Sequence, residues 1–68
     1  MSEIIFQVEE SPEGGFEAHA LGVSIFTDGE DMEQLKANVK EAVAAHFDQD
    51  TMPRVIRLHF VKEIVIAA

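Results

Sequence analysis

The chain has 68 residues, of which 47% are hydrophobic and none is cysteine. This composition is too apolar for a disordered acidic tail, its apolar runs are too short to cross a bilayer, and it allows neither a disulfide nor a thiolate metal site. Thirteen acidic residues against five basic ones give a net charge of −8, which repels nucleic-acid phosphates and favours a basic protein partner. We therefore expect one small domain spanning residues 1–68 that binds neither membrane nor nucleic acid directly. We expect it in the cytoplasm, because the first residues show no secretion signal.

Short strands account for the first part of the chain. Residues 3–10 alternate apolar and polar side chains, which is typical of a half-buried strand. The proline and two glycines within residues 11–15 predict a tight hairpin turn, after which residues 16–21 alternate again. A bend at Gly22 leads to a third short strand at residues 23–27, which an Asp-Gly turn ends. We predict that these three strands are antiparallel.

Residues 31–47 are predicted to form the one helix, because their apolar side chains recur at three- and four-residue steps. Asp31 is placed to cap the free amide groups of the first turn, and Gln34 can reach back towards the cap. The stripe that should face a sheet consists of Leu35, Val39, Ala42, Val43, His46 and Phe47.

Residues 54–68 predict a long fourth strand with mostly apolar even positions, bent where Lys62 and Glu63 interrupt it. The predicted fold class is therefore α+β in the order β-β-β-α-β, with the helix on one sheet face. In this arrangement Leu35, Val39, Val43 and Phe47 of the helix pack on the sheet face presented by Ile4, Phe6, Val8, Phe16 and Ala18, or by their alternates on the last strand.

The last predicted strand also indicates self-association. One helix shields only one sheet face, and Ile64, Val65 and Ile66 stand together near the end of the strand. Exposed apolar strand ends tend to pair with other chains. We therefore expect a homodimer or tetramer with these three residues in the interface.

No pattern in the chain indicates catalysis, a cofactor or a metal. His19, His46 and His59 lack the spacing that builds a metal site within one element. Several glutamates around the first hairpin could in principle supply a general acid and a general base. No nucleophile or glycine-rich phosphate loop accompanies them, so they do not indicate an active site. We expect a protein that is not an enzyme and has no cofactor.

The order of these parts resembles the N-terminal domain of the HicB antitoxin family and its stand-alone relatives. The resemblance runs from Ile5 to Phe47 and is carried by Gly14-Gly15-Phe16, the bend at Gly22, the lead-in from Thr27 to Asp31, and the helix MEQLKANVKEAV. It implies a partial ribonuclease-H-like fold without a working catalytic centre. In the antitoxins, this domain holds a small basic messenger-RNA-cleaving toxin inactive.

Several positions depart from the family pattern. Leu21-Gly22-Val23 replaces a Pro-Gly loop, Asp31 replaces a threonine cap, and Gln34-Leu35 replaces Glu-Ala. The DNA-binding domain that usually follows in the antitoxins is not expected here, so operator binding does not carry over.

Two classes of function follow from the sequence. The first is a non-catalytic interaction module, antitoxin-like or an orphan of that type, that binds a small basic partner such as a HicA-like toxin. The alternative is a small-molecule-binding or accessory domain of a metabolic enzyme complex that uses a cleft between sheet and helix. For the first class, the expected partner-binding residues are Glu9, Glu10, Glu13, Glu17, Asp28, Glu30 and Asp31.

Overall fold

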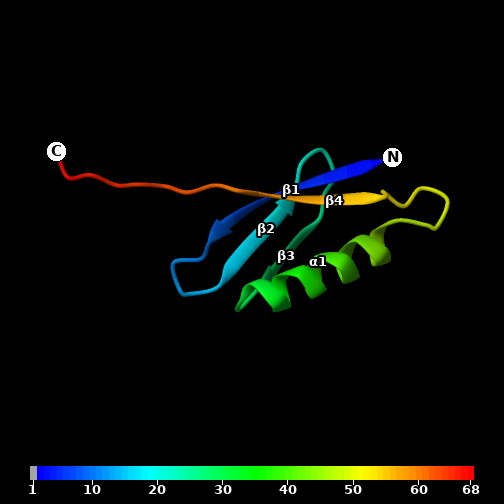
Figure 1. Cartoon of the computed structure of the whole chain (residues 1–68), viewed down its shortest axis with the longest axis horizontal. Coiled ribbons are helices and arrows are strands. Elements are labelled where there is room, and N and C mark those ends of the chain that lie inside the picture. The colour runs from blue at the N-terminus through cyan, green and yellow to red at the C-terminus, as the bar shows by residue number, and fades with distance from the viewer. Residues whose placement is uncertain (1) are drawn as a thin grey trace.

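The computed structural model describes residues 2–68, which form four strands and one helix (Figure 1). In chain order the elements are β1 (Glu3–Glu10), β2 (Phe16–Ala20), β3 (Phe26–Gly29), α1 (Met32–His46) and β4 (Val55–Phe60). The strands join in one sheet in the order β3-β2-β1-β4. The three N-terminal strands are antiparallel, as predicted, and β4 runs parallel to β1. The predicted α+β class and β-β-β-α-β order are confirmed, with α1 carrying the chain from one sheet edge to the other.

The third strand lies later in the chain than predicted. Gly22 has a φ of +82°, and the loop that it opens is closed by the Ala20 N–H donating to the Ile25 carbonyl at 2.9 Å. Ile25 is only 8% exposed and belongs to the core rather than to a strand. The prediction of a strand at residues 23–27 followed by an Asp-Gly turn is therefore wrong, because Gly29 is the last residue of β3.

The helix begins and ends where its sequence signals place it. The Asp31 carboxylate accepts from the Gln34 amide at 2.8 Å, and the Gln34 side chain accepts from the Glu30 amide at 2.6 Å. These two bonds satisfy free amide groups at the start of the helix. At the other end, Phe47 has extended backbone and its N–H still reaches the Val43 carbonyl.

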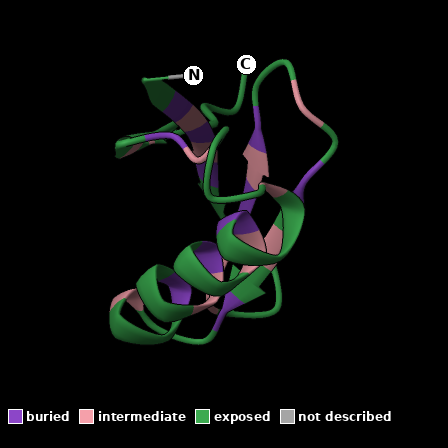
Figure 2. Cartoon of the chain, turned by 90° about the vertical axis from the view of Figure 1, so that its right-hand side faces the viewer, coloured by how far each residue is buried: buried purple, intermediate pink, exposed green. Residues whose placement is uncertain are grey.

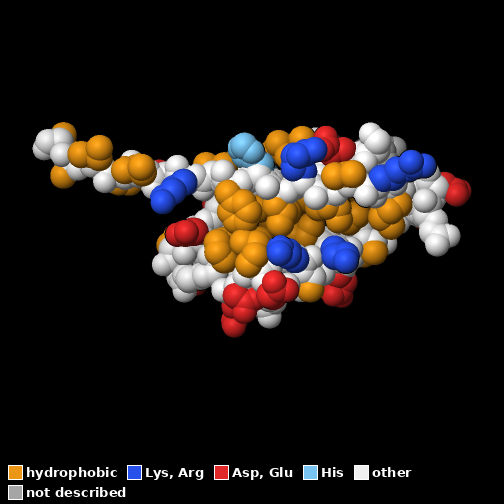
Figure 3. All heavy atoms as spheres, in the orientation of Figure 1, with side chains coloured by type: hydrophobic (Ala, Val, Ile, Leu, Met, Phe, Trp, Pro, Cys, Tyr) orange, Lys and Arg blue, Asp and Glu red, His pale blue; other side chains and the backbone are white. Residues whose placement is uncertain are grey.

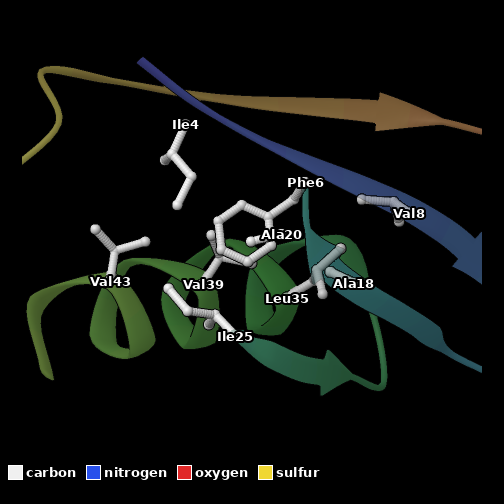
Figure 4. Close-up of a cluster of buried hydrophobic side chains, with 9 residues drawn as sticks. All are labelled: Ile4, Phe6, Val8, Ala18, Ala20, Ile25, Leu35, Val39 and Val43. Carbon is white, nitrogen blue, oxygen red and sulfur yellow. The ribbon is translucent and has the colours of Figure 1, made fainter. Parts of the chain in front are cut away.

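The core lies between α1 and the face of the sheet that β1 and β2 present to it (Figure 4). Leu35, Val39 and Val43 are at most 2% exposed, and buried residues lie on the sheet-facing side of the helix (Figure 2). The small side chains of Ala18 and Ala20 let α1 lie close to β2. The predicted packing is confirmed, except that His46 is exposed; its ring meets the ring of Phe47 edge-on, with the centroids 4.9 Å apart. The buried core consists of Ile4, Phe6, Val8, Ala18, Ala20, Ile25, Leu35, Val39 and Val43.

The fourth strand is shorter than predicted. β4 follows β1 from Val55 to Phe60, and the Val61 N–H donates to the Val8 carbonyl at 2.9 Å. Beyond that point β4, as an edge strand, has no neighbour within the described residues, and residues 61–68 extend away from the sheet without regular structure (Figure 1). The prediction of a long strand over residues 54–68, bent at Lys62 and Glu63, is therefore wrong for its second half, which forms no strand.

Candidate partner-binding surface

The β1–β2 hairpin is closed by its own backbone. The Ser11 N–H donates to the Gly15 carbonyl at 2.9 Å, and the Gly14 N–H donates to the Ser11 carbonyl at 3.0 Å. Gly14 and Gly15 have φ values of +100° and +81°, which glycine adopts readily. The turn therefore holds Glu13 at a defined place at the tip of the hairpin.

Close backbone contacts then fix the hairpin against the start of the helix. A Cβ atom at Gly29 would lie 2.5 Å from the Leu35 nitrogen, so only glycine allows β3 to approach α1 this closely. A Cβ atom at Gly15 would lie 2.6 Å from the Gly29 carbonyl oxygen. The Asn38 side chain also donates to the Asp28 carbonyl at 2.8 Å. Hairpin, β3 and the first turns of α1 thus form one rigid unit.

This unit gathers most of the predicted partner-binding residues. A polar depression of about 670 Å³ lies between the hairpin and the β3–α1 connection. Its lining includes the acidic residues Glu13, Glu17, Asp28 and Glu30. Glu9 stands directly opposite Glu17 in the register of β1 and β2.

Two of the predicted residues do not belong to this group. Glu10 stands opposite Phe16, so it lies on the other sheet face from Glu9. Asp31 uses its carboxylate to cap the helix. Conversely, Gln34 and Asn38 line the depression and were not expected there, although their spacing of four residues places them on one side of the helix.

Glu9, Glu17 and Asp28 form a row across three strands on the face away from the helix. The register pairs Glu17 with Glu9 on one side and with Asp28 on the other. Like charges directly opposite one another destabilise a sheet. Among the described residues that line the depression there is no Lys or Arg, so this negative charge is not neutralised locally.

The basic residues lie elsewhere. Arg57 pairs with Glu3 at 2.6 Å across β4 and β1, and Lys62 lies in the extended segment. The other three, Lys36, Lys40 and Arg54, line a second hollow. Among the described residues, the basic side chains therefore lie outside the lining of the acidic depression.

This second hollow is an apolar groove between α1 and β4, about 510 Å³ in volume. Figure 3 shows hydrophobic side chains gathered there, with Lys and Arg side chains beside them. The groove exists because α1 lies over β2 and β3 and leaves the same face of β4 uncovered. Its apolar residues are Val39, Val43, Met52, Pro53, Ile56 and Leu58.

The three histidines lie on three different elements. His19 and His59 stand on either side of Gln7, on β2 and β4 respectively, and His46 lies on the helix. Within residues 2–68 no group of three His, Asp or Glu side chains has a geometry that could hold a metal ion. None of these residues belongs to a helix that is both long and apolar enough to span a bilayer.

The chain is similar in sequence to proteins of one family. A UPF0150 protein of Thermotoga maritima is 40% identical over 65 residues, and the alignment covers 96% of this chain and 91% of the relative. The chain belongs to the UPF0150 family. A UPF0150 protein of Archaeoglobus fulgidus is 46% identical over 52 residues, covering 76% of this chain and 77% of the relative. No family model and no solved structure matches the chain.

The UPF0150 relatives carry names that state neither an activity nor a partner. The alignment with the Thermotoga maritima relative spans nearly the whole chain, so it includes the greater part of both the acidic depression and the apolar groove. The geometry and charge of each surface indicate what that surface can bind.

Proposed function

We propose that this UPF0150 chain is a non-catalytic, HicB-type interaction module that binds a small basic protein at its acidic depression. The observation that carries the proposal is the assembly of Glu13, Glu17, Asp28 and Glu30 around one depression with no basic residue in its described lining. Carboxylates without local counter-ions attract a basic surface and suppress acidic competitors. The partner class implied by the antitoxin resemblance, a small basic RNA-cleaving toxin, has the complementary charge.

The rigidity of this surface supports the same proposal. The glycine contacts at Gly15 and Gly29 and the Asn38 side chain hold the acidic residues on ordered backbone. A surface that is already ordered loses little conformational entropy on binding. The like-charge row of Glu9, Glu17 and Asp28 is unfavourable in the free chain, and a cationic partner would relieve it.

The first step of the test is to look for a neighbouring gene that encodes a short basic protein, and the product of such a gene is the probe; the absence of any such gene would count against the proposal. The association rate of the probe should fall about tenfold or more when salt rises from about 0.05 to about 0.5 M, because the screening length shrinks from roughly 14 to roughly 4 Å. Replacing Glu9, Glu13 and Glu17 by lysine should slow association to a similar extent at low salt. A growth assay should show the toxic effect of the basic protein returning with this variant.

A matched control reverses three acidic residues far from the depression. Glu41, Asp48 and Asp50 are exposed on the helix and the loop after it, and their reversal changes the net charge equally. Association that slows as much with this control as with the hairpin variant would show that only total charge matters. An association rate that changes neither with salt concentration nor with charge reversal at the hairpin would refute the proposal.

One observation favours the alternative function, a small-molecule-binding domain. The apolar groove lies between sheet and helix, where such a ligand was expected, and Lys36, Lys40 and Arg54 line it. An amphipathic carboxylate would place its chain on the apolar floor and its head beside these cations. Titration with a medium-chain fatty acid, followed through chemical shifts of Ile56 and Leu58, tests this directly; an absence of shifts at saturating ligand would exclude it.

A further inference from the structure

The extended segment of residues 61–68 exposes an unusual amount of apolar surface. Ile64, Val65 and Ile66 are 76%, 84% and 83% exposed, although they follow one another in the chain. Single exposed hydrophobic residues are common, but a contiguous run marks an interaction site. All three are β-branched and favour an extended strand that pairs with a neighbour.

The apolar groove lies beside an edge that is ready to accept such a strand. β4 is the last strand of the sheet, so the backbone groups on its outer side have no partner strand within the described residues. An edge strand of this kind is a template for strand addition. Ile56 and Leu58, which form the β4 side of the groove, are only partly buried.

The segment does not reach the groove of its own chain. β4 leads the chain away from Ile56 and Leu58, and residues 61–68 continue in that direction (Figure 1). A return would need a reversal within Val61-Lys62-Glu63. The tight hairpin turns that reverse a strand need positive φ and favour Gly, Asn or Asp, which are all missing from this stretch.

We propose that a second copy of this chain supplies the missing strand. The β4 strands of two copies pair antiparallel about a two-fold axis, and residues 61–68 of each continue along β4 of the other beside its apolar groove. The groove of either copy is then complete only when the other contributes its segment. This inference is independent of the partner-binding proposal, because it involves a different surface.

Side-chain alternation selects the register. Pairing Val61 with Val61 of the second copy places Ile64 opposite Leu58 and Ile66 opposite Ile56. Residues directly opposite on antiparallel strands share a face, so both isoleucines join the groove side of the sheet. On the other face, Glu63 meets His59.

Neighbouring registers give less favourable pairs of directly opposite side chains. A shift by two residues in one direction places Lys62 opposite Lys62, which opposes like charges. A shift in the other direction places Lys62 opposite Leu58 and Ile66 opposite Arg54. Of these three registers, the central one alone gives both isoleucines apolar partners without placing like charges opposite each other.

The first test is cysteine cross-linking, for which the chain is suited because it contains no cysteine. Leu58→Cys and Ile64→Cys variants are prepared separately, mixed and mildly oxidised. The mixture should form a disulfide-linked dimer, because directly opposite positions fall within disulfide range. Each variant alone should not, since equivalent residues at either position are six residues apart in this register, roughly 20 Å.

A matched control replaces Ile64→Cys by Val65→Cys, whose side chain lies on the opposite face from Leu58. The mixture of Leu58→Cys with Val65→Cys should stay largely uncross-linked. Efficient disulfide formation by Ile64→Cys alone would show that the segments pair with each other instead, and would overturn the proposal. No disulfide in any mixture would overturn it as well.

The second test measures assembly by light scattering. The wild-type chain should have twice its single-chain mass of 7.5 kDa, and the Ile64→Asp/Ile66→Asp variant should be a monomer with unchanged circular dichroism. Val65→Asp should remain dimeric, because in this register the new carboxylate faces Arg57 of the second copy. A wild-type monomer at tens of micromolar would refute the proposal and leave the groove to a small ligand.

The salt dependence of binding distinguishes this interface from the acidic depression. Two copies of charge −8 repel each other, and the proposed contacts are mainly apolar. The dimer should therefore become tighter as salt rises, whereas binding of a basic partner at the acidic depression should weaken. A dimer that dissociates at high salt would contradict an apolar strand exchange.

Discussion

The acidic depression and the apolar groove lie on opposite sides of α1 and towards different ends of the sheet. The depression lies at the hairpin end of β1, where glycine contacts lock strands and helix together. The groove lies towards the other end, where β4 begins beside the start of β1 and the helix no longer covers the sheet. The region around the depression is acidic, and close backbone contacts between strands and helix make it rigid. The region around the groove is apolar, is lined with basic residues and is not covered by the helix. Two surfaces of such different character in one small chain favour two different binding events.

The largest expected contrast compares one leucine from each region. Leu35 is 0% exposed beneath the acidic end, whereas Leu58 is partly buried in the open groove. Leu35→Ala should lower the free energy of unfolding by about 3 to 4 kcal/mol, because it leaves a cavity in a closed core. Leu58→Ala should cost about 1 kcal/mol in the monomer, because less apolar surface is lost from burial.

Urea unfolding at low protein concentration measures both variants. The Leu58→Ala loss should grow as protein concentration rises, since a second copy then covers the groove. If the two variants lost equal free energy of unfolding at low protein concentration, Leu58 would be as tightly packed in the monomer as Leu35, which would contradict this comparison.

The next contrast concerns glycines at the acidic end. Gly29→Ala should destabilise the chain by about 2 to 3 kcal/mol, because the new methyl group meets the Leu35 backbone, which cannot move aside. Gly14→Ala should cost about 1 kcal/mol, because it faces open space and only its positive φ is strained. Thermal unfolding should show the larger fall in Tm for Gly29→Ala; the reverse order would mean that the hairpin turn, rather than the β3–α1 contact, limits stability.

The smallest contrast concerns charge, and its two parts have opposite signs. Glu17→Gln should raise the free energy of unfolding by roughly 0.5 kcal/mol, because it removes a charge that faces Glu9 and Asp28. Glu3→Gln should lower it by only a few tenths of a kcal/mol, since its ion pair with Arg57 is exposed to solvent.

Both charge effects should fade as salt rises. Glu17→Gln should also slow binding of the basic partner, so that stability and binding change in opposite directions. If Glu17→Gln destabilises the chain instead, the acidic row is not repulsive in the free protein.

Local sequence signals determined most of the elements. Residues 3–10 place Ile4, Phe6 and Val8 at alternate positions and form β1 with the predicted bounds, and Asp31 and Gln34 cap the helix as their spacing indicates. The acidic grouping was also accessible, because the hairpin and the β3–α1 connection are each short and rich in carboxylates. These features depend on interactions between residues that are close in the chain.

Only the tertiary structure decided where β4 lies and what that leaves open. Residues 54–68 are mostly apolar at even positions, yet only Val55–Phe60 form a strand, and their pairing with β1 ends at Val8 and Phe60 although β1 itself continues to Glu10. The role of Gly29 was likewise hidden, since an Asp-Gly pair is typical of a turn and its close contact with Leu35 comes from the distant packing of helix on strand. The apolar groove arises from strand order, which puts β4 beyond β1 while α1 lies over β2 and β3. Alternation along a strand specifies which side chains share a face, but not which neighbour or helix covers that face.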